Sequence, residues 1–161
     1  MSQIDDLNEK SNDSTSFRQC HHSDLSRVQK LVLQLYETDP GEYPVRPEIE
    51  KTFSEFDSHP EKGKIIVFER DGEIVGYAIL VFFWSNEFGG DIIEIDEILI
   101  ERKYRRLGIG KKFFSWLDNE YSKCCGYALQ TTEHNESAIA LYKSIGFRAS
   151  RNEYFIKLKN S

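Results

Sequence analysis

The segment Glu101–Lys112, ERKYRRLGIGKK, is the most informative stretch of this chain. It holds six basic residues and one acidic residue, a local charge of +5. It follows a β-rich run and opens a helical pattern, and Gly108 and Gly110 stand at the helix start although each glycine costs about 1 kcal/mol there relative to alanine. Positive charge in the first turn also opposes the helix dipole. A bound polyanion resolves both conflicts, because unpaired N–H groups, the dipole and basic side chains together form a pyrophosphate cradle. The basic side chains expected in this cradle are Arg105, Arg106 and Lys111.

Two familiar phosphate-binding loops do not fit this segment. A Walker loop requires glycine where Arg105 stands and serine or threonine where Lys112 stands. A dinucleotide-binding fingerprint requires a third glycine where Phe113 stands. The remaining alternative is a solvated basic loop with two turn glycines.

The flanking sequence predicts antiparallel strands followed by a βαβα pattern, which indicates an α/β (α+β) protein with a mixed sheet covered by helices on both faces. Asp71-Gly72 predicts a tight hairpin turn, and Pro40, Pro60 and Gly146 mark helix ends. The expected strands are Phe17–Cys20, Ile65–Glu69, Ile74–Trp84, Ile92–Ile100, Tyr127–Thr131 and a closing hairpin of Phe147–Ser150 and Tyr154–Leu158. The expected helices run from Ser23 to before Pro40, from Pro47 to about His59, over Gly108–Lys123 and over Asn135–Ile145.

Length and composition fit one folded domain. The chain has 161 residues, and residues 1–16 are too polar to fold, which predicts a disordered tail before a single domain over 17–161. The net charge of −6 argues against a general nucleic-acid or anionic-membrane binder. Three cysteines without metal-ligand spacing indicate reduced thiols, no metal site and a cytoplasmic protein, and no apolar run is long enough to span a membrane.

Arg105, Gly108 and Gly110 fill the pattern Arg/Gln-x-x-Gly-x-Gly/Ala, and in this the chain resembles the GNAT superfamily of acetyl-CoA-dependent N-acetyltransferases. The resemblance covers about Phe17 to Leu158 and includes Asn135–Phe147, NESAIALYKSIGF. It implies a GNAT-like fold, with a central, mostly antiparallel mixed sheet of about six or seven strands and about four flanking helices. It also implies acetyl-CoA as co-substrate and no metal.

The resemblance further implies which residues bind the co-substrate. Backbone groups near Ile98 and Ile100 would contact the pantetheine arm, and an N–H near Leu99 would polarise the thioester carbonyl. Asn135 would lie beside the pantetheine and Tyr142 beside the departing thiolate, which it would protonate. Their spacing of seven residues places both on one helix face, although Asn135 could serve only as an N-cap and Tyr142 only as core packing. The full set is Ile98, Leu99, Ile100, Arg105, Arg106, Leu107, Gly108, Ile109, Gly110, Lys111, Asn135 and Tyr142.

Acyl transfer to an amine requires a proton acceptor, because an alkyl ammonium has a pKa near ~10. Asp96 and Glu97 are the candidates. Simple strand alternation places Glu97 on the face of Ile93 and Ile95, unless a bulge near the acidic pair resets the register, so the inward-facing carboxylate stays open. A solvated strand face is the alternative for both. No cysteine occupies a position that the family uses, so direct attack by the amine is expected.

Within the superfamily the chain looks most like the diamine and polyamine branch that includes spermidine/spermine N-acetyltransferase. The likeness lies in Tyr36-Glu37, the aromatic stretch ending at Trp84, and Asp96-Glu97, whereas Ser137 stands where that branch has proline. Glu37–Glu61 carries eight acidic and two basic residues, a field that attracts a cationic amine, although these could be solubilising surface. Tyr36, Glu37, Trp84 and Asp96 are the expected acceptor contacts. We therefore expect acetyl transfer to a primary amine of a small cationic molecule; a protein or peptide acceptor, a non-catalytic CoA-binding domain and a homodimer are left open.

Overall fold

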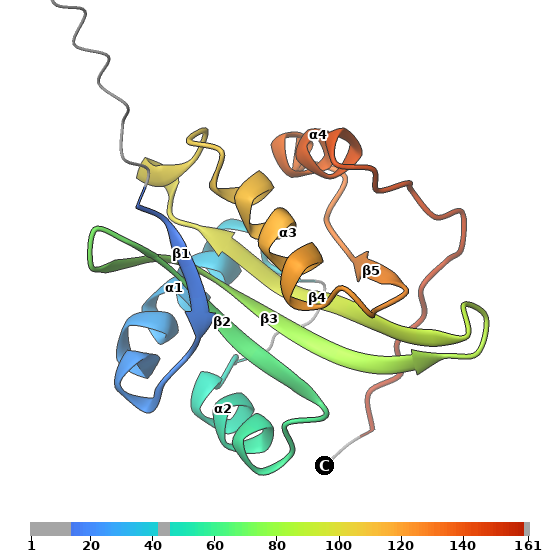
Figure 1. The fold of residues 1–161 in the computed structure, drawn as a ribbon, viewed down its shortest axis with the longest axis horizontal. Helices are drawn as coiled ribbons and strands as arrows, with labels where there is room; N and C mark the ends of the chain where they lie inside the picture. Colours follow the sequence, from blue (N-terminus) through green and yellow to red (C-terminus); the bar gives the residue numbers. More distant parts are fainter. Residues whose placement is uncertain (1–13, 42–45, 160–161) are drawn as a thin grey trace, which may run out of the picture. The chain divides into compact units, whose positions relative to one another are not determined.

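The computed structural model describes residues 14–41 and 46–159, and the chain divides into two compact units, Met1–Gln130 and Thr131–Ser161. The first unit holds a five-stranded sheet in the order β1 (Ser16–Gln19), β2 (Gly63–Arg70), β3 (Glu73–Ser85), β4 (Gly90–Ile100) and β5 (Gly126–Leu129) (Figure 1). The first three pairings are antiparallel and β4 pairs with β5 in parallel. The expected α/β fold with a mixed, mostly antiparallel sheet is thereby confirmed.

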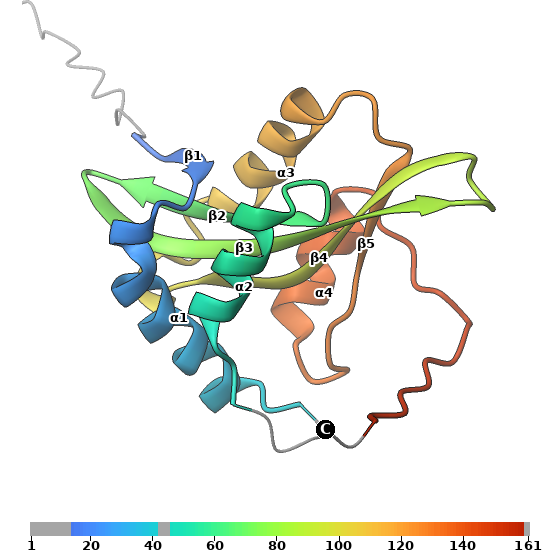
Figure 2. The ribbon, with the colours of Figure 1, turned by 90° about the horizontal axis from the view of Figure 1, so that it is seen from below.

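One face of the sheet is covered by α1 (Leu25–Thr38) and α2 (Ile49–Ser58), with the short 3₁₀ helix η1 (His22–Asp24) before them (Figures 1 and 2). Helical spacing brings Val28, Leu31 and Val32 of α1 to one side, where they pack with residues of β2, β3 and β4 in one buried cluster. The sheet residues of this cluster are Ile65, Val67, Tyr77, Ile79 and Leu99.

The opposite face is covered by α3 (Ile109–Glu120), which buries Phe113, Phe114 and Leu117 (Figure 2). The ring of Phe113 lies 4.6 Å from that of Phe68 on β2, and Phe17 on β1 packs edge-on against Phe68. Val67 and Phe68 are neighbours on β2 and therefore point to opposite faces of the sheet. Val67 belongs to the apolar layer under α1 and Phe68 to the layer under α3.

Turn chemistry behaves as the sequence predicts at the β2–β3 hairpin. Asp71 has a φ of 52° and Gly72 a φ of 80°, the two left-handed residues that a two-residue hairpin loop prefers.

In the second unit, α4 (Glu136–Ser144) begins after Asn135, whose Oδ1 accepts a 3.4 Å hydrogen bond from the N–H of Ala138. Gly146, with a φ of 100°, follows the end of this helix.

Three expectations about elements need correction. The predicted tail reached residue 16; residues 1–13 lie outside the described residues, and Ser16 belongs to β1. The closing hairpin, Phe147–Ser150 with Tyr154–Leu158, is not formed, since residues 147–159 contain no strand. Tyr154, Phe155 and Leu158 are exposed there. The strand-like alternation of this segment is insufficient because a strand needs a hydrogen-bonding partner. Within residues 14–41 and 46–159 the sheet therefore has five strands instead of six or seven.

Candidate active site

A bulge in β4 sets the orientation of the acidic pair. Ile79 on β3 pairs with Glu97, but the next residue, Leu80, pairs with Ile95, so Asp96 is the extra residue of β4. The bulge moves Glu97 onto the face of Tyr77 and Ile79, opposite to Ile95. The register of β3 and β4 therefore determines which carboxylate of the acidic pair faces α1, and it is Glu97.

The Glu97 carboxylate is held by two tyrosine hydroxyls. Tyr36, from the last turns of α1, donates a hydrogen bond of 2.7 Å to Oε1, and Tyr77, from β3, donates one of 2.8 Å to Oε2. Tyr77 is 0% exposed. Tyr36 was expected from the sequence, whereas Tyr77 was missed: a tyrosine inside the apolar run of β3 was its only signal.

Burial and hydrogen bonding act in opposite directions on Glu97. Desolvation raises the pKa of its carboxyl most strongly, the two hydroxyls lower it, and the nearby negative charge of Asp96 raises it again. Desolvation, with Glu97 beside them, also raises the pKa of Tyr36 and Tyr77 well above the usual range, so both hydroxyls keep their protons. Asp96 itself is exposed at the bulge, although desolvation raises the pKa of its carboxyl too.

Beyond the bulge, β4 and β5 separate. β5 pairs only with Ile92–Ile95, so within the part of the chain that the structure describes the edge of residues 96–100 has no strand beside it. The N–H of Glu101 donates to the carbonyl of Val75 on the β3 side (2.9 Å). By alternation the backbone groups of Leu99 also point to β3, where Leu99 pairs with Tyr77, and those of Ile98 and Ile100 point to the open edge. The Leu99 N–H therefore points away from the open edge and does not fit the expected contact with the thioester carbonyl. The backbone groups of Ile98 and Ile100 point toward the open edge, as the expected contacts with the pantetheine arm require.

The basic segment forms a tight loop between β4 and α3. The 3₁₀ helix η2 (Arg102–Tyr104) comes first, and Gly108 then takes the N-cap position of α3 with a φ of 77°, a left-handed conformation that favours glycine. The first helical bond runs from the N–H of Lys112 to the carbonyl of Gly108 (3.1 Å), and no side chain that the structure describes caps the helix. The N–H groups of Ile109, Gly110 and Lys111 are therefore the orphan donors of this helix N-terminus.

Cationic side chains surround this N-terminus. Arg105, Arg106 and Lys111 are exposed, and Arg106 adopts a φ of 64°, strained for a residue with a side chain. The Nε of Arg105 donates to the carbonyl of Ile100 (2.9 Å), which fixes the root of its guanidinium next to the open edge of β4. Leu107 is exposed, and Ile109 and Gly110 are buried. The loop thus joins orphan N–H groups and positive charge, the combination that binds a phosphate group.

A salt bridge anchors the beginning of this loop. Arg27 on α1 pairs with Glu101 (2.8 Å) and also donates to the carbonyl of Ile74 (3.0 Å). The sequence gives no signal for this partnership, because 74 residues separate the two side chains.

Not every expected acceptor contact lies near Glu97. Trp84 is 67% exposed and pairs with Asp91, five residues along β3 from Ile79, or about 17 Å. Alternation also places it on the face of Phe82, away from Tyr77, so the structure does not bring Trp84 to the acidic pair. Glu37 is exposed at the end of α1, next to Tyr36.

Asn135 and Tyr142 belong to the second unit. The Asn135 side chain caps α4, as the simpler interpretation holds. Tyr142 is buried, burial raises the pKa of its hydroxyl, and its ring lies 5.8 Å from that of Phe147. Its role beyond packing stays a prediction.

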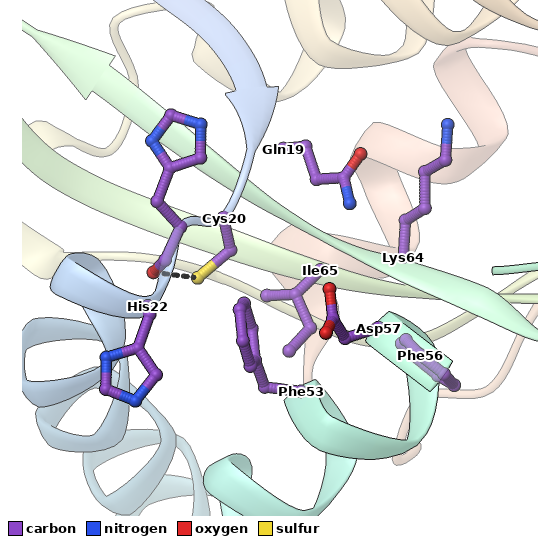
Figure 3. Close-up of a pocket in the computed structure, with 9 residues that line it drawn as sticks. Gln19, Cys20, His22, Phe53, Phe56, Asp57, Lys64 and Ile65 are labelled. Carbon is purple, nitrogen blue, oxygen red and sulfur yellow. Dashed lines mark hydrogen bonds between the residues drawn. The ribbon is translucent and has the colours of Figure 1, made fainter. Parts of the chain in front are cut away.

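A separate hollow of about 380 Å³ lies beside α2 and contains none of the expected site residues (Figure 3). Its lining includes Cys20, His22, Phe53 and Lys64. The Cys20 thiol donates to the carbonyl of His21 (3.4 Å), and burial raises its pKa to about 12, so this thiol is a poor nucleophile near neutral pH.

Comparison with known proteins identifies the family. The model of the Acetyltransferase (GNAT) family matches residues 29–147, well over half of the chain, and the protein belongs to this family of acetyl-CoA-dependent N-acetyltransferases. The strand-loop-helix segment with Arg105, Gly108 and Gly110 lies within the match.

Solved structures show the same fold. A possible acetyltransferase from Clostridium difficile 630 aligns with a TM-score of 0.74 and 22% identity over 91% of this chain and 99% of that one. A ribosomal-protein-alanine N-acetyltransferase from Brucella melitensis biovar Abortus 2308 aligns with 0.71 and 18% over 90% and 99%. An aminoglycoside acetyltransferase from an uncultured soil metagenomic sample aligns with 0.71 and 15% over 91% and 97%. At these identities the likeness concerns the fold, and the polyamine branch is not established by it.

Two further findings concern metals and membranes. Residues 14–41 and 46–159 contain no group of three or more His, Cys, Asp or Glu side chains that could hold a metal ion. None of the helices in the same residues combines the length and apolar character needed to cross a membrane.

Proposed function

We propose that this N-acetyltransferase acts on a primary amine of a small cationic molecule, such as a di- or polyamine, and that Glu97 accepts the amine proton. The observation that carries the proposal is the half-buried, doubly hydrogen-bonded Glu97 carboxylate at the bulge, where β4 and β5 separate within the first unit. The basic loop follows β4 directly and begins only a few residues after Glu97.

The loop residues fit the pyrophosphate of acetyl-CoA. The N–H groups of Ile109, Gly110 and Lys111 have no helical acceptor, Gly108 permits close approach of the backbone, and the side chains of Arg105 and Arg106 add charge-assisted donors. The open-edge backbone groups of Ile98 and Ile100 would hydrogen-bond the pantetheine arm. When bound, the co-substrate supplies an activated acetyl thioester.

Each bond and proton of the transfer has a place in this proposal. The amine nitrogen attacks the acetyl carbonyl, a C–N bond forms and the C–S bond breaks. One proton of the ammonium passes to Glu97, directly or through water, before attack, because the charged amine is not a nucleophile. The second leaves the nitrogen after the C–N bond has formed and passes to solvent, from which Tyr142 recovers the proton that it gives to the thiolate. Tyr142 would give its proton to the departing thiolate. Its assignment follows from the resemblance of Asn135–Phe147 to the corresponding segment of the family.

Charge supports a cationic acceptor. Asp96 is exposed beside Glu97, Glu37 is exposed beside Tyr36, and the stretch Glu37–Glu61 carries a net charge of −6. Such a negative field concentrates cations near its surface. A homodimer remains a prediction.

An amine panel tests the acceptor. Thiol release from acetyl-CoA would be followed with diamines and polyamines, an aminoglycoside, and peptides with a free N-terminus or lysine. We expect the highest kcat/KM with a di- or polyamine, falling as salt screens the acidic field. A preference for peptides would assign the chain to protein acetylation, and no thiol release with any amine would leave it a CoA-binding domain.

A further inference from the structure

We propose that Tyr77 and Tyr36 are positioning residues for acetyl transfer: their hydroxyls hold the Glu97 carboxylate in one orientation and in its charged form. The inference rests on the proposed role of Glu97 as proton acceptor. It adds Tyr77, a residue without an expected role, and gives Tyr36 a role other than acceptor contact.

The two hydrogen bonds select the ionised carboxylate. A charged carboxylate only accepts, and each of its oxygens here receives one hydroxyl proton, from Tyr36 at 2.7 Å and from Tyr77 at 2.8 Å. A protonated Glu97 would carry its proton on one of these two oxygens, which makes that oxygen a weaker acceptor for the hydroxyl beside it. With one acceptor direction used on each oxygen, a further direction on each remains for an amine or a water molecule.

The two donors differ in how firmly they are held. Tyr77 is 0% exposed and lies in the core cluster with Val67, Ile79 and Leu99, so its hydroxyl is fixed by close packing. Tyr36 is half-buried near the end of α1. The pair therefore ties one carboxylate to two elements, the rigid centre of the sheet and the helix next to the acidic stretch.

The local charges leave Glu97 dependent on these donors. The groups that act on it are Tyr36 from α1, Tyr77 from β3 and Asp96 from β4 itself. Desolvation and Asp96 both favour the neutral acid, and among the described residues the two hydroxyls are the groups that favour the charged base. Removing either hydroxyl should raise the pKa of Glu97 and move the onset of activity to higher pH.

A titration of the full chain tests this without relying on activity. With ¹³C-labelled glutamate carboxyls, the Glu97 signal is assigned by its loss in Glu97→Gln. In Tyr77→Phe and in Tyr36→Phe we expect its pKa to rise by about one pH unit, since hydrogen bonds to charged groups are among the stronger ones. Tyr121→Phe is the matched control, because Tyr121 is also partly buried but packs against Phe82 and Trp116. An unchanged Glu97 titration in both variants overturns the proposal; if Tyr77→Phe does not fold, Tyr36→Phe alone decides.

The rate profile gives the second readout. The acidic limb of kcat/KM for the amine should move to higher pH in step with the Glu97 pKa, while the KM for acetyl-CoA stays near that of the parent. A Glu97 pKa that moves without the limb would mean that the tyrosines only tie α1 and β3 to β4, which overturns the positioning role. Failure of the proposed function has a different signature, since the parent chain would then prefer peptides or release no thiol with any amine, whatever the titration.

Discussion

Tyr77 and Glu97 are diagonal neighbours across β3 and β4, joined by a 2.8 Å hydrogen bond although neither is the other's register partner. Tyr77 pairs with Leu99 and Glu97 with Ile79. Diagonal contacts of this kind require both side chains on the same face. Here the bulge at Asp96 provides that condition.

The two carboxylates should respond differently to amidation. Glu97→Gln removes the proposed proton acceptor, so we expect kcat to fall ~10²- to 10⁴-fold and the rise of the rate with pH to disappear. Asp96→Asn, the matched control one residue away, should leave kcat near that of the parent, because its side chain is exposed. Steady-state kinetics across pH with the best amine would measure both. Equal losses in the two variants would contradict the assignment of Glu97.

Gly108 offers a test of the phosphate cradle with a built-in control. Gly108→Ala and Gly72→Ala each place a side chain at a φ near 80° with open space around the new Cβ, so each should lower the free energy of unfolding by about 1–2 kcal/mol. Only Gly108→Ala should also weaken acetyl-CoA, by about tenfold or more, measured as a loss of the ligand-induced rise in Tm. Equal acetyl-CoA affinity in both variants would show that the cradle does not bind the pyrophosphate.

Arg105 and Arg106 should act through binding of the co-substrate. Arg→Ala at either position should raise the KM for acetyl-CoA far more than the KM for the amine, since the lost bonds are to phosphate groups. Arg102→Ala removes the same charge from η2 and should have a smaller effect, which separates geometry from net charge. Kinetics with acetyl-CoA and with its dephospho form, at two salt concentrations, would measure this. If all three variants and salt leave the KM unchanged, the segment is only a solvated loop.

Tyr142→Phe tests the proposed proton donor to the thiolate. A hydroxyl that helps only as charge develops lowers kcat and spares ground-state affinity, so we expect kcat to fall about 10²-fold with the Kd for acetyl-CoA almost unchanged. Tyr154→Phe, which removes an exposed hydroxyl from the same unit, is the control. Pre-steady-state measurement would ensure that chemistry limits the rate. Full turnover of the Tyr142 variant would assign that side chain to packing alone.

The elements that could be predicted from the sequence are those that local chemistry dictates. The basic loop, the helix that follows it and the Asp71-Gly72 hairpin turn depend on backbone conformations and charges within a few residues of one another, so their pattern can be recognised in the linear chain. The same holds for Asn135 as a helix cap. The order of strands and helices predicted a sheet covered on both faces, whereas alternation predicts the face of a side chain only as far as its strand keeps its phase.

Tertiary structure decided what depends on partners distant in sequence. Whether Glu97 or Asp96 faces α1 is set by one residue of slip between β3 and β4, and a single-residue slip reverses every side chain beyond it. Tyr36 and Arg27 reach their carboxylates across 61 and 74 residues, a separation that no local pattern encodes. Trp84 and the segment Tyr154–Leu158 have the residue types of a binding strand and a sheet strand. The register of β3 and β4, rather than its residue type, determines where Trp84 lies. Tyr154–Leu158 forms no strand although its composition suits one, because a strand also needs a pairing partner.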